Sequence, residues 1–548
     1  MKKRKVAFAL LLPLAFIVSS CDSGDAPSAS SLPSSQEPSE SSNNNDNSSD
    51  SGTSSSLEDI DPLEGYEKSN SVTEFSDEDM AKVNMRPTFD VADCIFDASD
   101  YIVPYQIFKD GMCLQRDAVN RLWGTIEELK GNEHIAASFR GRTYYGVMNG
   151  NAWEIYLPKM MAGGPDDLTL ICDWGTKVIK DVYVGEVYLL SGQSNMEWKV
   201  GWSEDVLKDL YSSPSKCLNE NIRMLSVDGQ FHSEPTTSLK SEPVWHGANS
   251  ESIPEFSAVG YIFGKKMQET LGCPVGLVCT AIGGTIAESW MDKETYEEYA
   301  KTVDKTACDP QYIWKTPSQG FNGMIYPLEG FNFRGVTWYQ GCSSIYGAEK
   351  NHDKALKALI SSWRKALHNP NLTFSMAELA RFYEDTLAYS TINEKIGVVA
   401  SEDDLVLRAI NLDQGEWGNI HPKDKRAIGT RLANETLRKF YGYEENEAPR
   451  VASYQVVSST EVHLAMDKDV LLKNGANGFE ILTENGYSFN CEATLEGRTI
   501  TLKSSLPFTG IRYGYDFKKV AEIVQDVSKT VTIYDIEGLP CDIFKLSF

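Results

Sequence analysis

Ser194, Gln340 and His421 each follow an apolar run that is typical of a strand. A serine hydroxyl becomes a nucleophile when a base removes its proton and when donors wait for the oxyanion. In open α/β sheets, ligands bind at the carboxyl ends of the strands. A serine at such an end often only caps the next helix. The histidine and the glutamine downstream favour a chemical role, with Ser194 as nucleophile.

The elements that must position these side chains form an alternating pattern. The run ending at Gly192 contains Val182, Val184, Val187 and Leu189, which predict a buried strand. Alternation of strands and helices after Ser194 predicts an α/β domain with a doubly wound parallel sheet over residues 181–446. Its expected strands are 274–282, 336–339, 373–379 and 405–412, and its expected helices are 258–271, 348–368 and 422–441, the last with Pro422 in its first turn.

Two flanking regions have the pattern of antiparallel strands. Residues 86–180 and residues 447–548 both contain short apolar or alternating runs separated by turn residues. Runs at 153–157 and 168–171 belong to the first region, and runs at 453–457 and 478–482 belong to the second. We therefore predict an N-terminal and a C-terminal β-sandwich domain on either side of the α/β domain.

The N-terminus resembles a bacterial lipoprotein signal. Residues 1–21 comprise a basic start, an apolar run and small residues before Cys21. We expect Cys21 to be acylated and to attach a cell-surface, extracytoplasmic protein to a membrane. An ordinary cleaved signal is the alternative. Residues 22–85 are rich in Ser, Asn and acidic side chains, so we predict a disordered tether.

Charge and cysteine spacing exclude several function classes. The net charge of −26 argues against nucleic acid and anionic membrane surfaces as partners. No Cys/His set has zinc spacing and no phosphate or dinucleotide fingerprint appears, so neither a metal nor a cofactor is expected. Beyond Cys21, we predict mostly unpaired thiols, because Cys113, Cys172 and Cys279 occupy apolar runs.

Five motifs together resemble the sialate O-acetylesterase family, a branch of the SGNH-type serine esterases. They are G-E-V-Y-L-L-S-G-Q-S-N-M-E-W, F-S-A-V-G-Y-I-F-G-K-K, G-G-T-x-x-E-S-W-M, R-G-V-T-W-Y-Q-G and G-N-I-H-P-K-D-K, in the family's order. The resemblance runs from about residue 108 to the C-terminus. It implies an SGNH-like fold and a serine carboxylic-ester hydrolase that removes acetyl groups from carbohydrates.

The mechanism expected from these roles uses a Ser–His pair. His421 takes the Ser194 proton, and the alkoxide attacks an acetyl ester carbonyl. The oxyanion is met by the backbone N–H of Ser194, a backbone N–H at Gly283 or Gly284, and the side-chain amide of Gln340. Water then releases acetate from the acetyl-enzyme, and a sugar hydroxyl is the leaving group.

Two positions depart from the family pattern. Where the family usually continues W-Y-Q-G-E-S-N, this chain has Cys342 and Ser344 in place of the acidic residue and the asparagine. Gly418 stands three residues before the histidine, where SGNH enzymes commonly have an aspartate. Asp413, Glu416 or a backbone carbonyl remain candidates to orient the imidazole, as does a Ser–His dyad with no third group.

The substrate is inferred more from the resemblance than from residues. Sialate 9-O-acetyl groups and acetylated polysaccharide such as xylan both remain open. Trp198 and Trp417 are expected to line the pocket, whereas Trp338 is expected in the core. A substrate carboxylate would require an arginine, for which the candidates are Arg223, Arg334 and Arg381. The alternative function is a catalytically weakened or inactive carbohydrate-binding lipoprotein of the same fold.

Overall fold

The computed structural model describes residues 75–548, except residues 84, 132, 346, 383–386, 517, 519, 521, 523 and 524. All described residues belong to one unit, Asp61–Phe548. The predicted signal peptide, the lipidation site Cys21 and residues 22–74 of the predicted tether lie outside the described residues. In the part that is described, no helix has the length and apolar character needed to cross a membrane.

The end of the predicted tether is ordered, which corrects the boundary at residue 85. Residues Asp77–Lys82 form helix α1, and the Ser76 side chain caps it by accepting a hydrogen bond from the Asp79 N–H at 3.1 Å. The Lys82 ammonium lies 2.7 Å from the Glu154 carboxylate. Composition alone missed this segment, because a specific ion pair anchors it to the N-terminal region.

The central sheet is built around strand β9 (Gly175–Gly192), which is buried at every residue from position 182 to its end. A continuous buried run fits a parallel sheet that is covered on both faces. β12 pairs with one side of β9 and β13 pairs with the other, both in parallel. The sheet order is β11 (His246–Ala248), β10 (Asn219–Ser226), β12 (Val275–Cys279), β9, β13 (Gly335–Tyr339), β14 (Thr373–Ala377) and β15 (Val406–Ala409), with β11 antiparallel at the edge.

This strand order places the switch in chain direction at β9. The chain leaves β9 for β10 and β12 on one side, and then crosses to β13, β14 and β15 on the other. Such a reversal opens a crevice at the carboxyl ends of the central strands. Ser194 follows β9 directly and therefore lies at this crevice.

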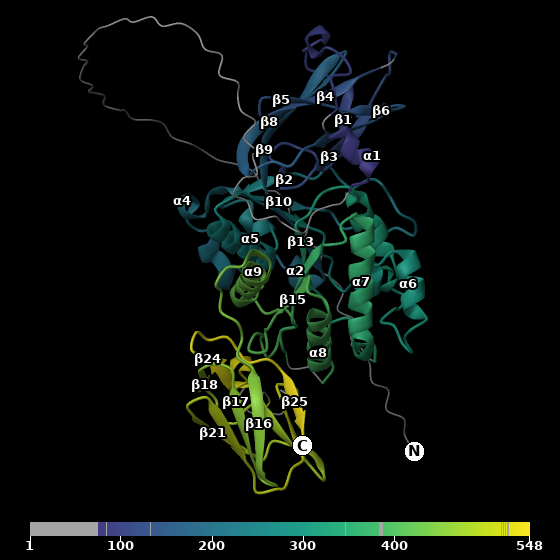
Figure 1. Cartoon of the computed structure of the whole chain (residues 1–548). Coiled ribbons are helices and arrows are strands. Elements are labelled where there is room, and N and C mark those ends of the chain that lie inside the picture. The colour runs from purple at the N-terminus through teal and green to yellow at the C-terminus, as the bar shows by residue number, and fades with distance from the viewer. Residues whose placement is uncertain are drawn as a thin grey trace, which may run out of the picture. The chain divides into compact units, whose positions relative to one another are not determined.

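Helices cover the sheet in two groups (Figure 1). α5 (Ala258–Leu271) packs against α9 (Arg426–Tyr441), while α7 (His352–Ala366) contacts α6 (Lys293–Ala300) and α8 (Leu387–Glu402). The bounds predicted for α5 are confirmed. Ser257 caps its start by accepting from the Gly260 N–H at 3.0 Å, and Gly272 ends it at φ 65°. The α/β class predicted for this region is confirmed.

β9 also extends into the N-terminal region. There β1 (Ile102–Pro104), β3 (Asn120–Ile126), β7 (Ala152–Leu157) and β6 (Val147–Asn149) form one antiparallel sheet. β8 (Gly163–Cys172) pairs with β9 instead, and β4 (Ile135–Phe139) and β5 (Arg142–Tyr145) follow beyond β8 in the same sheet. Asp181, at φ 53°, lies within β9. The predicted boundary between residues 180 and 181 thus falls inside one continuous strand.

The C-terminal region contains two four-stranded antiparallel sheets. One has the order β16 (Val451–Ser458), β17 (Glu461–Met466), β22 (Thr499–Lys503), β21 (Glu492–Glu496). The other has the order β20 (Gly486–Ser488), β19 (Phe479–Thr483), β23 (Gly510–Tyr513), β25 (Phe544–Ser547). Apolar side chains from both sheets, among them Val462 and Ile481, share one buried cluster.

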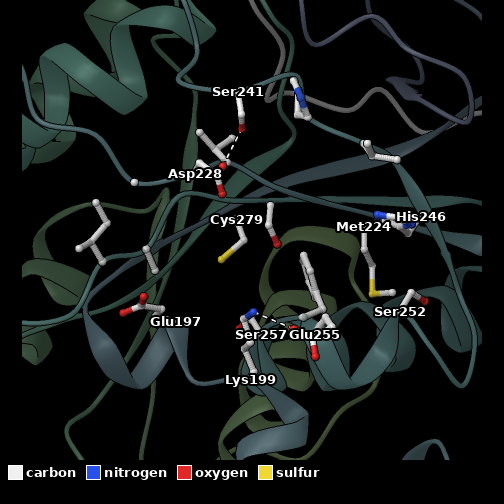
Figure 2. A pocket seen from close by; sticks show the side chains of 18 of the residues that line it. Glu197, Lys199, Met224, Asp228, Ser241, His246, Ser252, Glu255, Ser257 and Cys279 are labelled. Carbon is white, nitrogen blue, oxygen red and sulfur yellow. Dashed lines mark hydrogen bonds and ion pairs between the residues drawn. The ribbon is translucent and has the colours of Figure 1, made fainter. Parts of the chain in front are cut away.

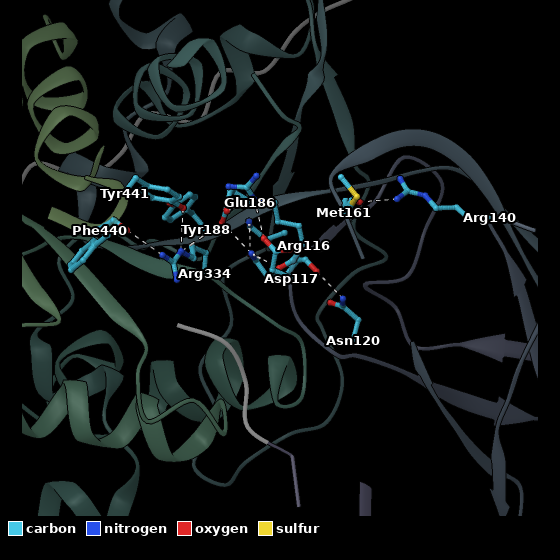
Figure 3. Close-up of polar contacts among 12 residues, drawn as sticks. Arg116, Asp117, Asn120, Arg140, Met161, Glu186, Tyr188, Arg334, Phe440 and Tyr441 are labelled. Carbon is cyan, nitrogen blue, oxygen red and sulfur yellow. Dashed lines mark hydrogen bonds and ion pairs between the residues drawn. The ribbon is translucent and has the colours of Figure 1, made fainter. Parts of the chain in front are cut away.

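A cluster of charged side chains is centred on Glu186 of β9 (Figure 3). The Glu186 carboxylate is fully buried and accepts from the Arg116 Nε at 2.5 Å, and it lies 3.8 Å from the Arg334 Nε. Arg334 also donates to the Tyr441 hydroxyl at 3.2 Å. Arg116 follows β2 (Cys113–Gln115), whereas Tyr441 ends α9. The cluster therefore joins the N-terminal region to the α/β sheet.

Candidate active site

The turn that carries Ser194 is held tightly against the neighbouring strand. Gly192 has φ 135°, and a Cβ at this position would lie 2.2 Å from the Tyr339 carbonyl oxygen. Only glycine fits such a close approach. The Gln193 side chain accepts from the Gly341 N–H at 2.9 Å. Ser194 then begins the short helix α2 (Ser194–Glu197) with its position fixed by β13.

The structure brings Ser194 and His421 together. The His421 Nε2 lies 2.8 Å from the Ser194 Oγ, although 227 positions separate the two residues. Both side chains are partly exposed. Partial burial and the nearby Lys425 charge lower the pKa of His421. A neutral imidazole at this distance can accept the hydroxyl proton.

Stacking holds the His421 ring. The Trp198 ring lies parallel to the imidazole, with centroids 4.9 Å apart and an interplanar angle of 20°. The indole N–H of Trp198 donates to the Ser203 Oγ at 2.8 Å, which fixes the indole in turn. The predicted pocket residue Trp198 therefore contacts the imidazole itself.

Neither carboxylate proposed from the sequence reaches the imidazole. Asp413 forms an ion pair with Arg431 at 2.6 Å. Glu416 accepts from the Asn419 side-chain amide at 3.2 Å and from the Lys423 N–H. Across the described residues, no carboxylate is hydrogen-bonded to His421. The arrangement is a Ser–His dyad with the histidine loop braced by Glu416.

A buried lysine ties the histidine loop to the nucleophile turn. The Lys425 ammonium is fully buried and donates to the Asn195 Oδ1. The Asn195 amide also donates to the Ile420 carbonyl at 3.1 Å. Burial lowers the pKa of Lys425 to about 7. Two backbone segments on either side of the dyad are thus joined through one asparagine.

The same loop corrects the predicted start of the last helix. α9 begins at Arg426, so Pro422 lies in the loop before it and not in its first turn. The loop is held by side-chain bonds instead: the Asn419 Oδ1 accepts from the His421 N–H at 2.9 Å, and the amide of Asn419 donates to the His421 carbonyl.

The predicted oxyanion donors differ in whether their N–H groups already have an acceptor. The Gly283 N–H donates to the Glu197 carboxylate at 2.7 Å. The amide of the buried Gln340 donates to the Thr285 carbonyl at 3.2 Å and to the Ser344 Oγ at 3.3 Å. These two donors are already engaged.

Two backbone donors remain at the site. Within the described ranges, the N–H groups of Ser194 and Gly284 donate to no protein acceptor. Gly284 has φ 77°, and a Cβ there would lie 3.2 Å from the Trp314 ring. Ser194 and Gly284 are therefore the predicted donors that are open to an oxyanion in this conformation.

The two tryptophans predicted to line the pocket have different surroundings. Trp198 contacts His421 and also packs edge to face with Trp202, with centroids 5.3 Å apart. Trp417 is partly buried and packs against Val527 of the C-terminal region. Trp338 is buried in the core, as predicted.

Sequence reasoning did not single out four residues that shape this site: Gln193, Asn195, Glu197 and Lys425. The signal was available, because all four lie within the motifs that contain Ser194 and His421. Their partners could not be read from those motifs. Among the residues that the structure describes, no group of three or more His, Cys, Asp or Glu side chains is placed to hold a metal ion.

Comparison with known proteins matches this region to one family. Residues 184–438 match the family model described as carbohydrate esterase, sialic acid-specific acetylesterase. The sialate O-acetylesterase of Homo sapiens is 27% identical over 320 residues, which cover 52% of this chain and 59% of the human protein. That of Rattus norvegicus is 25% identical over 398 residues, which cover 60% and 72% respectively. The match thus spans 59% of the length of the human relative.

A solved structure agrees with the sequence comparison. The crystal structure of a carbohydrate acetylesterase from Xanthomonas citri has a TM-score of 0.71 at 25% identity, covering 81% of this chain and 99% of that chain. The resemblance found in the sequence motifs is confirmed. Residues 184–438, which carry both Ser194 and His421, are similar to the sialic acid-specific acetylesterase family of carbohydrate esterases.

Proposed function

We propose that this chain is a serine carboxylic-ester hydrolase that removes acetyl groups from sugar hydroxyls. The observation that carries the proposal is the distance of 2.8 Å between the Ser194 Oγ and the His421 Nε2. The family match over residues 184–438 supports a carbohydrate ester as the substrate class. Sialate 9-O-acetyl groups and acetylated polysaccharide such as xylan both belong to this class.

The reaction follows from the dyad. His421 accepts the Ser194 proton, and the alkoxide attacks the acetyl carbonyl. The N–H groups of Ser194 and Gly284 stabilise the tetrahedral oxyanion. His421 then protonates the departing sugar oxygen, and a water molecule deprotonated by the same imidazole releases acetate. Stacking on Trp198 orients the imidazole throughout, in the role that a carboxylate has in a triad.

The finer parts of the proposal come from the sequence. We assign an SGNH-type α/β esterase fold to the central region, and β-sandwich folds to residues 447–548 and to the N-terminal region, which includes α1 and the first part of β9. The lipoprotein-like signal over residues 1–21 supports an acylated Cys21 and an extracytoplasmic, cell-surface location. Mass spectrometry of the N-terminal peptide tests the acylation, which an unmodified thiol at Cys21 would contradict.

A non-catalytic carbohydrate-binding protein is the second candidate. Three observations favour it: Gly283 donates its N–H to Glu197, Cys342 replaces the family's acidic residue, and Gly418 replaces a common aspartate. A binder would retain the fold and the pocket without turnover. The two candidates differ in whether acetate is released.

Ser194→Ala separates them. The purified protein is incubated with p-nitrophenyl acetate and with acetylated xylan, and released acetate is measured. We expect Ser194→Ala and His421→Ala each to lower kcat by at least about 10⁴-fold, because nucleophile and base act as one unit. Ser361→Ala, an exposed serine of α7, is the matched control and should keep the parent rate. Equal, buffer-level release by the parent and Ser194→Ala would identify the binder.

A further inference from the structure

A cavity of about 740 Å³ has Glu197, a residue of the helix that begins with Ser194, in its wall (Figure 2). Glu197 and Ile282 form part of its wall. Glu197 lies on the same short helix as Ser194, and its carboxylate accepts from the Gly283 N–H. A Cβ built on Gly283 would lie 3.4 Å from the Ser194 Cβ. Gly283 thus contacts both Glu197, which lines the cavity, and Ser194, which does not line it. The volume of the cavity fits a ligand of one or more sugar rings.

The charges that line this cavity are mostly negative. One lysine lines it, and Lys199 is paired with Glu255 at 2.9 Å. Asp228 is hydrogen-bonded to the Ser241 hydroxyl at 2.7 Å, a neutral partner. Among the described residues that line it there is no arginine. The lining carboxylates are Glu197, Asp228, Glu242, Glu251 and Glu255.

The three arginines that the sequence suggested for binding a substrate carboxylate already have other partners. Arg223 donates to the Gly111 carbonyl at 2.8 Å, and Arg334 belongs to the Glu186 cluster. Arg381 donates to the Gly514 carbonyl. None of the three lines the cavity. A substrate anion entering it would thus meet unpaired carboxylates without a matching cation, which is electrostatically unfavourable.

Uncharged sugars fit the same lining well. Carboxylates accept hydrogen bonds from hydroxyl groups, and such charge-assisted bonds are among the stronger ones. Trp202 is 51% exposed and borders the cavity, so part of its ring is available to the apolar face of a sugar. Trp202 also packs against Trp198, which stacks on His421. Trp202 in the cavity wall is thus linked to His421 through the Trp198 ring.

We propose that this cavity is the saccharide subsite of the esterase and that it selects uncharged acetylated sugars over anionic sialates. The inference rests on the proposed esterase function and specifies its substrate class. Repulsion by Asp228 and Glu251, neither of which forms an ion pair in the described structure, supplies the discrimination. Salt weakens it, because both side chains are exposed.

A matched pair of substrates tests the selection. The full chain is assayed for acetate release from 9-O-acetyl-N-acetylneuraminic acid and from its methyl ester, which has nearly the same shape without the negative charge. We expect kcat/KM to be at least about tenfold higher for the methyl ester at low salt. We expect this ratio to fall toward one as ionic strength rises. A ratio of one, or a preference for the anion, overturns the inference.

Variants that remove carboxylates test whether the preference for the methyl ester arises in the cavity. In Asp228→Asn/Glu251→Gln the ratio should fall at least threefold. In Glu492→Gln/Glu496→Gln, which removes two exposed charges from β21 of the C-terminal region, the ratio should stay at the parent value. Equal changes in both double variants would show that net charge, and not the cavity, discriminates. Release of acetate from p-nitrophenyl acetate by the parent but not by Ser194→Ala keeps this outcome separate from failure of the esterase function.

Discussion

Two buried ionisable side chains of the α/β domain, Glu186 and Lys425, have opposite surroundings. Glu186 and Lys425 both have 0% of their surface exposed. Glu186 lies between Arg116 and Arg334, at 2.5 Å and 3.8 Å. Lys425 donates to the neutral Asn195 amide oxygen, and in the described part of the chain it forms no ion pair with a carboxylate. Glu186 therefore has partners of opposite charge, whereas Lys425 has a neutral partner.

The difference in surroundings matches the roles that we assign to Glu186 and Lys425. A buried charge is costly unless it is paired, and a compensated cluster such as that of Glu186 can join two regions permanently. An uncompensated cation has a perturbed pKa, and such groups gather at functional sites. Lys425 lies next to the candidate base, where its charge lowers the pKa of His421. The Glu186 cluster thus serves stability, whereas Lys425 tunes the site.

The largest expected effect comes from breaking the compensated cluster. Glu186→Gln removes the carboxylate that lies between the partly buried Arg116 and the buried Arg334, so we expect the free energy of unfolding to fall by about 3–5 kcal/mol. Denaturant unfolding followed by fluorescence measures the change. Glu298→Gln, which removes an exposed partner of Lys301, should leave the midpoint unchanged. Equal midpoints for the two variants would show that the Glu186 cluster does not stabilise the fold.

Removing the uncompensated charge should act on the reaction. In Lys425→Met the pKa of His421 should rise, since the nearby cation is lost. The base must be neutral, so the acidic limb of the pH profile of kcat/KM should move to higher pH. We also expect kcat/KM at neutral pH to fall about ten- to a hundredfold, because Asn195 loses its partner and the loop loosens.

A nearby lysine provides the control for that variant. Lys423 lies in the same loop but is partnered with the exposed Asp205, at 2.7 Å. Lys423→Met should therefore leave the acidic limb in place. If Lys425→Met lowers the rate without moving the limb, Lys425 has only a structural role.

The contrast also shows what sequence could predict. Ser194 and His421 were predicted because each lies in a motif that follows a strand, and a parallel sheet brings strand ends to one edge. The bounds of α5 were predicted because Ser257 and Gly272 are local signals that act within a few residues. Strand ends and helix caps can be predicted because they depend on residues that are close together in the sequence.

The rest depends on contacts between distant residues. Gly283 and Glu197 are 86 positions apart, so the sequence could not show that this N–H already has an acceptor. Lys425 and Asn195 are 230 positions apart, so their hydrogen bond could not be predicted either. α9 begins four residues after Pro422, where the sequence had placed its start. α1 was missed because its anchor, Glu154, lies on a strand of the N-terminal sheet.

A carboxylate placed next to Lys425 should compensate its charge, as Arg116 and Arg334 compensate the charge of Glu186. Cys342 is close enough to Lys425 to interact with its charge, and it stands where the family usually has glutamate. The pKa of Lys425 is about 7 in the folded chain, against an ordinary 10.5. Between these values the unfolded chain binds more protons, so the free energy of unfolding should rise with pH by about 1.4 kcal/mol per unit. Below pH 7 Lys425 is protonated in both states and its penalty is constant.

Cys342→Glu should raise the pKa of Lys425 and flatten this rise. Melting temperatures measured from pH 7 to 9 test it, with Lys425→Met as the reference that lacks the titrating group. Cys342→Gln is the matched control, since it has the same size without the charge and should keep the parent slope. A parent slope equal to that of Lys425→Met would mean that Lys425 does not titrate in this range.

The smallest effect is expected at Glu416, and it distinguishes a dyad from a triad. The Glu416 carboxylate braces the loop through Asn419 and the Lys423 N–H, and it does not contact the imidazole. Glu416→Gln keeps an acceptor oxygen for these bonds, so kcat should fall by less than about tenfold with no shift in the pH profile. Loss of a carboxylate that orients the histidine of a triad costs about 10⁴-fold. A loss of that size would mean that Glu416 reaches His421 during turnover, and Trp198 would then not be sufficient to hold the base.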